Sequence, residues 1–105
     1  EKHAVGKLDE FYQNLVDTQK VDLIISGHDN SQQHIYIPDK PDMVISGVGG
    51  YAHTEKSKRT QMKKELKFRS LELGCIKIDV LRDVLTVSFY NTNQSQIYSF
   101  KIKKV

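Results

Sequence analysis

Hydrophobic positions recur along this chain with a helical period first and an extended period later. Near the N-terminus the apolar residues fall three or four positions apart, at Leu8, Phe11, Tyr12, Leu15 and Val16. This spacing predicts an amphipathic helix over residues 5 to about 18, with polar side chains on its other face. We expect the helix to cover one face of a sheet.

Two apolar runs that end in glycine predict strands. Residues 21–26 carry Leu23, Ile24 and Ile25 in succession and stop at Gly27, which suits an inner strand buried on both faces. Residues 43–46 form the second run, and three glycines follow it within residues 47–50. Those glycines do not follow the dinucleotide fingerprint. A short strand over residues 34–37, ended by Pro38, lies between the two runs.

The last third of the chain alternates strictly between apolar and polar residues. The alternation predicts three half-exposed strands over residues 74–81, 84–90 and 96–103, joined by tight turns as an antiparallel meander. The residues predicted to share the buried face are Ile76, Ile78, Val80, Leu85, Val87, Phe89, Tyr98, Phe100 and Ile102. Cys75, the only cysteine, is expected in the core as a small hydrophobe.

Residues 51–70 show neither period, and we interpret them as a long surface loop with one or two helical turns. The predicted fold class is therefore α/β: a mixed sheet with a flanking N-terminal helix and a C-terminal antiparallel meander. Apolar residues make up 38% of the chain and charged residues 28%, which is low for a self-sufficient domain. We expect residues 1–105 to be a single partial domain that needs cover from the remainder of a parent chain.

The net charge of +3 comes from a cluster of basic residues between Lys56 and Arg69. Phe68 is the only aromatic residue in that cluster, so base stacking has little support and no nucleic-acid partner is predicted. We interpret the cluster as a solvated charged loop, with a protein or membrane contact left open. No apolar run approaches the roughly 18 residues of a transmembrane helix, and the first residues do not form a signal peptide.

His28 carries the candidate chemistry because it follows a strand and a glycine directly. Its ring can lie at the edge of a sheet with one nitrogen free for a metal. The neighbouring Asp29 could orient another group or stabilise the loop. We interpret His34 as a strand or surface histidine and His53 as a solvated loop residue.

Taken together, three segments resemble the C-terminal part of the purple, or tartrate-resistant, acid phosphatases, a branch of the calcineurin-like metallophosphoesterases. They are Val-Asp-Leu-Ile-Ile-Ser-Gly-His-Asp-Asn at residues 21–30, Gln-Gln-His-Ile at 32–35, and Val-Ile-Ser-Gly-Val-Gly-Gly at 44–50. The order and spacing of these features carry the resemblance over essentially the whole chain. It implies half of a sandwich of two sheets, with metal ions near the strand ends.

The resemblance also implies roles for individual residues. His28 matches a metal ligand, the first histidine of Gly-His-x-His, and Asn30 stands where the second histidine ligand belongs. His3 matches a histidine that contacts substrate or supplies a proton. The family uses a metal pair, iron with zinc, manganese or iron, to activate a water for attack on a phosphomonoester.

Two departures from the family pattern leave two functions open. A carboxamide at Asn30 is a weaker donor than imidazole, and the family's earlier metal-binding motifs are missing from these 105 residues. The first hypothesis is a segment of an acid phosphatase that supplies one metal-ligand loop and is inactive by itself. The alternative is a degenerate, phosphatase-like scaffold that binds protein partners, as glideosome-associated membrane anchors do. By resemblance, the parent belongs to the secretory pathway or an endomembrane lumen; substrate-binding residues are not predicted.

Overall fold

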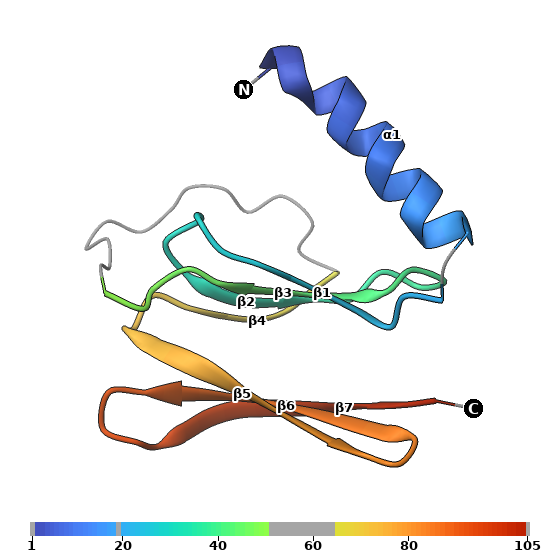
Figure 1. Ribbon diagram of the computed structural model, residues 1–105. Coiled ribbons are helices and arrows are strands. Elements are labelled where there is room, and N and C mark those ends of the chain that lie inside the picture. Colours follow the sequence, from blue (N-terminus) through green and yellow to red (C-terminus); the bar gives the residue numbers. More distant parts are fainter. Residues whose placement is uncertain (1, 19, 51–64, 105) are drawn as a thin grey trace.

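A computed structural model describes residues 2–18, 20–50 and 65–104 of the chain. One helix is followed by two groups of strands (Figure 1). The elements described are α1 (Lys2–Thr18), β1 (Leu23–Ser26), β2 (Gln32–Ile35), β3 (Asp42–Ser46), β4 (Leu66–Ser70), β5 (Gly74–Leu81), β6 (Val84–Asn91) and β7 (Gln96–Lys103).

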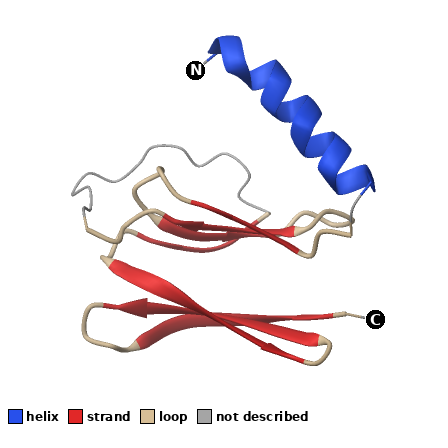
Figure 2. Ribbon diagram, viewed as in Figure 1, coloured by secondary structure: helices blue, strands red, loops and turns tan. Residues whose placement is uncertain are grey.

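The strands form two sheets that pack face to face as a sandwich. The first sheet has the order β1-β3-β2-β4 and is mixed, because β1 runs parallel to β3 while the other neighbours are antiparallel. The second sheet is the antiparallel meander β5-β6-β7, which lies beneath the first in the view of Figure 2. The predicted fold class, a mixed sheet with a helix and a closing meander, is confirmed.

The core lies between the two sheets. Val44 of β3 and Val87 and Phe89 of β6 are fully buried there. In the meander, Ile76 pairs with Phe89 and Val87 pairs with Phe100, so the predicted apolar positions do share one face. The alternation that predicted the meander therefore also predicted its buried side, except at Val80, which lies at the end of β5 and is 70% exposed.

β1 is an edge strand, which corrects the prediction that it lies inside the sheet. In the described part of the chain it pairs with β3 on one side only. Ile25 is 48% exposed, because no described layer covers its side chain on that face of the sheet. A run of consecutive apolar residues predicts burial on both faces, but it does not show which layers and neighbours are present.

The helix begins earlier than predicted, and the side chains described for it do not cover the sheet. α1 starts at Lys2 rather than at residue 5, and it leans away from both sheets in Figure 1. Phe11, on the predicted apolar face, is 65% exposed. The periodicity identified the amphipathic helix correctly but not what its apolar face packs against.

Part of the predicted surface loop is a strand. Residues 66–70 form β4, which pairs with β2 and places Phe68 opposite His34. The register shifts between His34 and Ile35, and this irregularity interrupts the simple alternation that marks a strand in sequence. The rest of the predicted loop, with its helical turns and most of the basic cluster, lies outside the described residues.

Two further expectations concern burial and membrane crossing. Cys75 is exposed, not part of the core, because it sits on the outer face of the meander, opposite Tyr90 and out of phase with Ile76. β2 begins at Gln32, two residues before the predicted strand. Among the helical residues described, no helix is long and apolar enough to cross a membrane.

Candidate functional site

The loop after β1 is a tight turn that holds His28 at its tip. The backbone N–H of Asp29 donates to the carbonyl of Gly27 at 2.9 Å, and the N–H of Ser31 donates to the carbonyl of Asp29 at 2.7 Å. His28 has a φ of 73°, in the left-handed region that few non-glycine residues adopt. Local hydrogen bonds thus fix an unusual backbone conformation where the sequence predicts the functional histidine.

The loop after β3 packs directly against this turn. The N–H of Gly47 donates to the carbonyl of Ser31 at 3.0 Å. A Cβ atom at Gly47 would lie 1.9 Å from the carbonyl oxygen of Asp29, which is far inside van der Waals contact. Glycine at position 47 is therefore what allows the two strand ends to meet, and the parallel pairing of β1 with β3 brings both to one edge of the sheet.

The two predicted metal-binding positions differ in exposure. His28 is exposed to solvent, and Asn30, two residues on, is half-buried. The carboxylate of Asp29 accepts a hydrogen bond from Nε2 of Gln33 at 3.2 Å. This contact joins the loop to strand β2 through two side chains.

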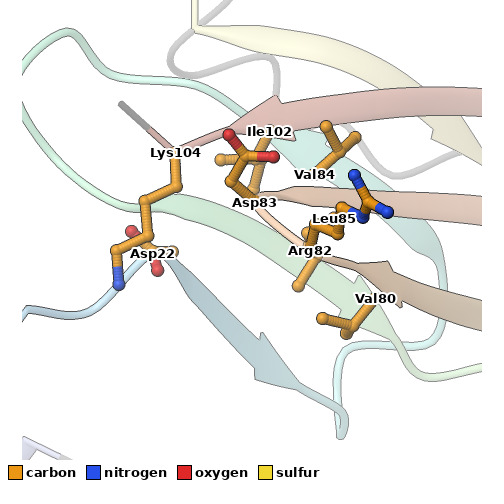
Figure 3. A pocket seen from close by; sticks show the side chains of 8 residues that line it. All are labelled: Asp22, Val80, Arg82, Asp83, Val84, Leu85, Ile102 and Lys104. Carbon is orange, nitrogen blue, oxygen red and sulfur yellow. The ribbon is translucent and has the colours of Figure 1, made fainter.

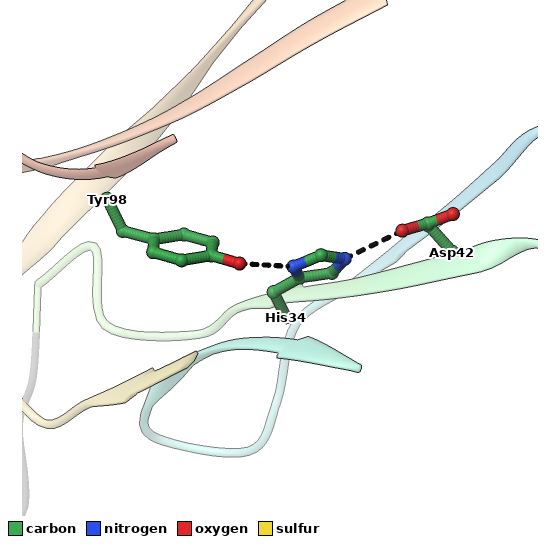
Figure 4. A network of polar contacts seen from close by, with 3 residues as sticks. All are labelled: His34, Asp42 and Tyr98. Atoms are coloured by element: carbon green, nitrogen blue, oxygen red, sulfur yellow. Dashed lines mark hydrogen bonds and ion pairs between the residues drawn. The ribbon is translucent and has the colours of Figure 1, made fainter. Parts of the chain in front are cut away.

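His34 lies in the core of the sandwich, where the sequence predicted a strand or surface residue. It is in strand β2, but its relative exposure is only 5%. Nδ1 lies 2.8 Å from the hydroxyl of Tyr98, on β7 of the other sheet, and Nε2 lies 2.7 Å from Oδ2 of Asp42 (Figure 4). The imidazole also stacks on Phe100, with ring centroids 3.6 Å apart and planes 5° from parallel.

The direction of the hydrogen bonds in this network follows from Tyr98 and Asp42. Burial raises the pKa of Tyr98 above its ordinary value of 10.0, and the negative charge of Asp42 raises it further. The hydroxyl therefore keeps its proton. A carboxylate only accepts, so Nε2–H of His34 donates to Asp42, and in the neutral ring Nδ1 then accepts from the hydroxyl of Tyr98. His34 links the two sheets with both ring nitrogens engaged, as buried polar groups require.

Sequence reasoning missed this network, although a signal for it was present. Tyr98 is in phase with the buried positions of β7, and His34 pairs with Val44, the buried centre of β3. Asp42 lies two residues from Val44 on β3 and hence on the same face as His34. Recognising the antiparallel pairing of β2 with β3 would have been enough to bring the three residues together.

The side chains described do not form a metal centre by themselves. No group of three or more histidine, cysteine, aspartate or glutamate side chains that could hold a metal occurs among them. The loop after β1 offers one free imidazole, from His28, and one carboxamide, from Asn30. His3 lies in the first turn of α1, and its side chain, like the whole of His53, is outside the described part of the structure.

Comparison with characterised proteins agrees with the sequence and the fold. The chain is 24% identical over 91 residues to purple acid phosphatase 4 of Arabidopsis thaliana, an alignment that spans 87% of this chain. The chain is similar to the purple acid phosphatases. No family model matches the chain.

The fold is also that of a solved structure described as GAP50, the anchor in the inner membrane complex of Plasmodium. That structure matches 100% of this chain with a TM-score of 0.75 and 20% sequence identity, a likeness that shows the fold. The chain spans 27% of the length of the plant phosphatase and 31% of the GAP50 chain. It resembles the C-terminal part of a purple acid phosphatase-like protein, and the predicted resemblance is confirmed.

Proposed function

We propose that this chain is the C-terminal part of a purple acid phosphatase-like scaffold that binds partners and has lost the family's hydrolytic activity. Asn30 carries the proposal. It occupies the position where the resemblance places the second histidine ligand, at the end of the same strand as His28. A carboxamide oxygen is neutral and a weaker donor to transition metals than imidazole nitrogen.

The other described histidine does not replace the missing ligand. His34 has Nδ1 on Tyr98 and Nε2 on Asp42, and its ring is stacked on Phe100 in the core. Freeing either nitrogen would leave the half-buried carboxylate of Asp42 or hydroxyl of Tyr98 without this partner. His28 is then the one described imidazole open to a ligand, which supports weak metal binding at this strand end.

The likeness to GAP50 supports a scaffold role. That protein is described as the anchor in the inner membrane complex of Plasmodium, so the same fold serves as an anchor there. For this chain we propose protein partners of a membrane-associated complex, within the secretory pathway or an endomembrane lumen. We further propose that residues 1–105 are part of one domain, and that the parent chain covers β1 and the apolar face of α1.

A second candidate, an acid phosphatase, is favoured by the presentation of His28. A hydrogen-bonded turn holds this side chain in solvent at the edge of the sheet, as a metal ligand requires. In that case other parts of the protein would supply the remaining ligands of a metal pair, iron with zinc, manganese or iron, which activates a water. His3 would contact the phosphomonoester or supply a proton.

Hydrolysis of a generic phosphomonoester by the full-length parent protein and by its His28→Ala variant separates the two functions. For the scaffold we expect the wild-type rate to equal that of the variant, because no complete metal site depends on His28. A wild-type rate that His28→Ala lowers by about a hundredfold or more would overturn the proposal and establish the phosphatase.

A further inference from the structure

The end of β5, next to its turn into β6, exposes two large aliphatic side chains. Val80 is 70% exposed and Leu81 is 73% exposed, and no other large hydrophobic side chain in the described segments is as exposed. Arg82 follows in the turn with a φ of 55°. Val80 and Leu81 are consecutive in the strand, so Val80 lies on the face shared with Ile78 and Leu81 lies on the opposite face. Two aliphatic side chains this exposed at one strand end indicate a contact surface. We call residues 80–84 the hairpin tip.

Positive charge surrounds the hairpin tip. The meander sheet and the residue after it carry five cations and two carboxylates: Lys77, Arg82, Lys101, Lys103 and Lys104, with Asp79 and Asp83. Oδ2 of Asp79 lies 3.7 Å from Nζ of Lys77, so these two charges offset each other. The remaining excess lies at the tip and at the end of β7, where Val84 pairs with both Leu81 and Lys103.

A hollow of about 180 Å³ adjoins the tip at the open end of the sandwich (Figure 3). Val80, Leu85 and Ile102 line it with apolar side chains. Its charged lining residues, which include Lys104 and Asp22, are cations and carboxylates in equal number. The hollow therefore has no net charge of its own. The net attraction for an anion comes from the lysines of β7 around it.

We propose that the hairpin tip and the lysines at the end of β7 dock onto an anionic lipid surface. Leu81 and Val80 enter the headgroup region, and Lys101, Lys103 and Lys104 contact the anionic headgroups. Exposed aliphatic side chains next to lysines combine the two attractions that hold a protein at such a surface, apolar burial and charge. Because the two side chains lie on opposite faces of the strand end, a fluid interface that surrounds the tip buries both, whereas a flat protein surface would cover one of them.

This docking surface is independent of the proposed function at the histidine loop. The hairpin tip belongs to the meander, and His28 belongs to the loop that follows β1 in the other sheet. Loss or presence of hydrolysis therefore leaves the docking proposal untouched, and failure of docking leaves the assignment at His28 and Asn30 untouched.

Co-sedimentation of the purified protein with vesicles of phosphatidylcholine, with and without phosphatidylserine, tests the proposal. We expect binding to the phosphatidylserine vesicles that weakens as sodium chloride is added, because screening reduces the charge attraction. Leu81→Gln should weaken binding by at least about tenfold, since it removes the inserted aliphatic group. Leu73→Gln, the same change at an exposed leucine before the other end of β5, should bind as the wild type does.

A second pair of variants examines the charge. Lys101→Gln with Lys103→Gln should weaken binding by about tenfold, because each removes one cation near the surface. Lys67→Gln with Arg69→Gln, on β4 at the edge of the other sheet away from β1, should leave binding unchanged. The proposal is overturned by absence of binding to phosphatidylserine vesicles or by undiminished binding of Leu81→Gln. Binding to polyglutamate in place of the vesicles would likewise reject lipid and indicate an acidic protein partner.

Discussion

Replacing His34 with alanine is expected to lower the free energy of unfolding by about 3 to 5 kcal/mol. The change removes a ring stacked at 3.6 Å on Phe100 and leaves the half-buried hydroxyl of Tyr98 and carboxylate of Asp42 without their common partner. Lost packing and unpaired polar groups act in the same direction. Urea denaturation of the purified protein, followed by circular dichroism, gives the free energy.

A double-mutant cycle shows whether His34 acts through the network. We expect His34→Ala and Asp42→Ala together to cost less than the sum of the single changes by at least about 1 kcal/mol, since both remove the same hydrogen bond. His28→Ala supplies the matched control and should cost less than about 1 kcal/mol, because that ring is exposed. Additive single changes, or equal losses at His34 and His28, would contradict the structural role assigned to His34.

Replacing Gly47 with alanine is expected to destabilise the protein by about 2 to 3 kcal/mol and to displace the loop that carries His28. The added Cβ would lie 1.9 Å from the carbonyl oxygen of Asp29 and 2.8 Å from its carbonyl carbon. These are backbone atoms, so the clash is relieved only when one of the strand-end loops moves. Urea denaturation measures the cost, and NMR chemical shifts of residues 27–31 report the movement.

Gly49→Ala is the control for that experiment. A Cβ at Gly49 meets no atom within 4 Å, and its φ is not positive, so alanine should change the stability by less than about 0.5 kcal/mol. Equal effects at positions 47 and 49 would show that the close contact between the two loops does not hold in solution.

The meander could be predicted from sequence because its signal is local. Each of its strands alternates over about eight residues, and the two turns between them are short, so the neighbours in sequence are also the neighbours in the sheet. The apolar positions around Val87 and Phe89 therefore identified the buried face as well. The strand, glycine and histidine pattern at β1 placed the candidate site for the same reason.

Features that depend on pairing between strands distant in sequence could not be predicted from local patterns. β4 pairs with β2 through a register shift, and its five residues lack a clean period. The edge position of β1 is set by which strand lies beside it, and no property of Leu23, Ile24 or Ile25 encodes that. His34 was predicted to be ordinary because its partners, Asp42 and Tyr98, come from another strand and another sheet.

The affinity of the purified protein for Zn²⁺, measured by competition with a chromogenic chelator, tests most directly whether Asn30 weakens a metal site. We predict that Asn30→His binds Zn²⁺ at least about tenfold more tightly than the wild type, because imidazole replaces a weaker carboxamide donor beside His28. Asn93→His, which adds the same side chain at an exposed position in the turn between β6 and β7, should leave the affinity unchanged. Equal affinities in the wild type and Asn30→His, or an equal gain in Asn93→His, would contradict the account.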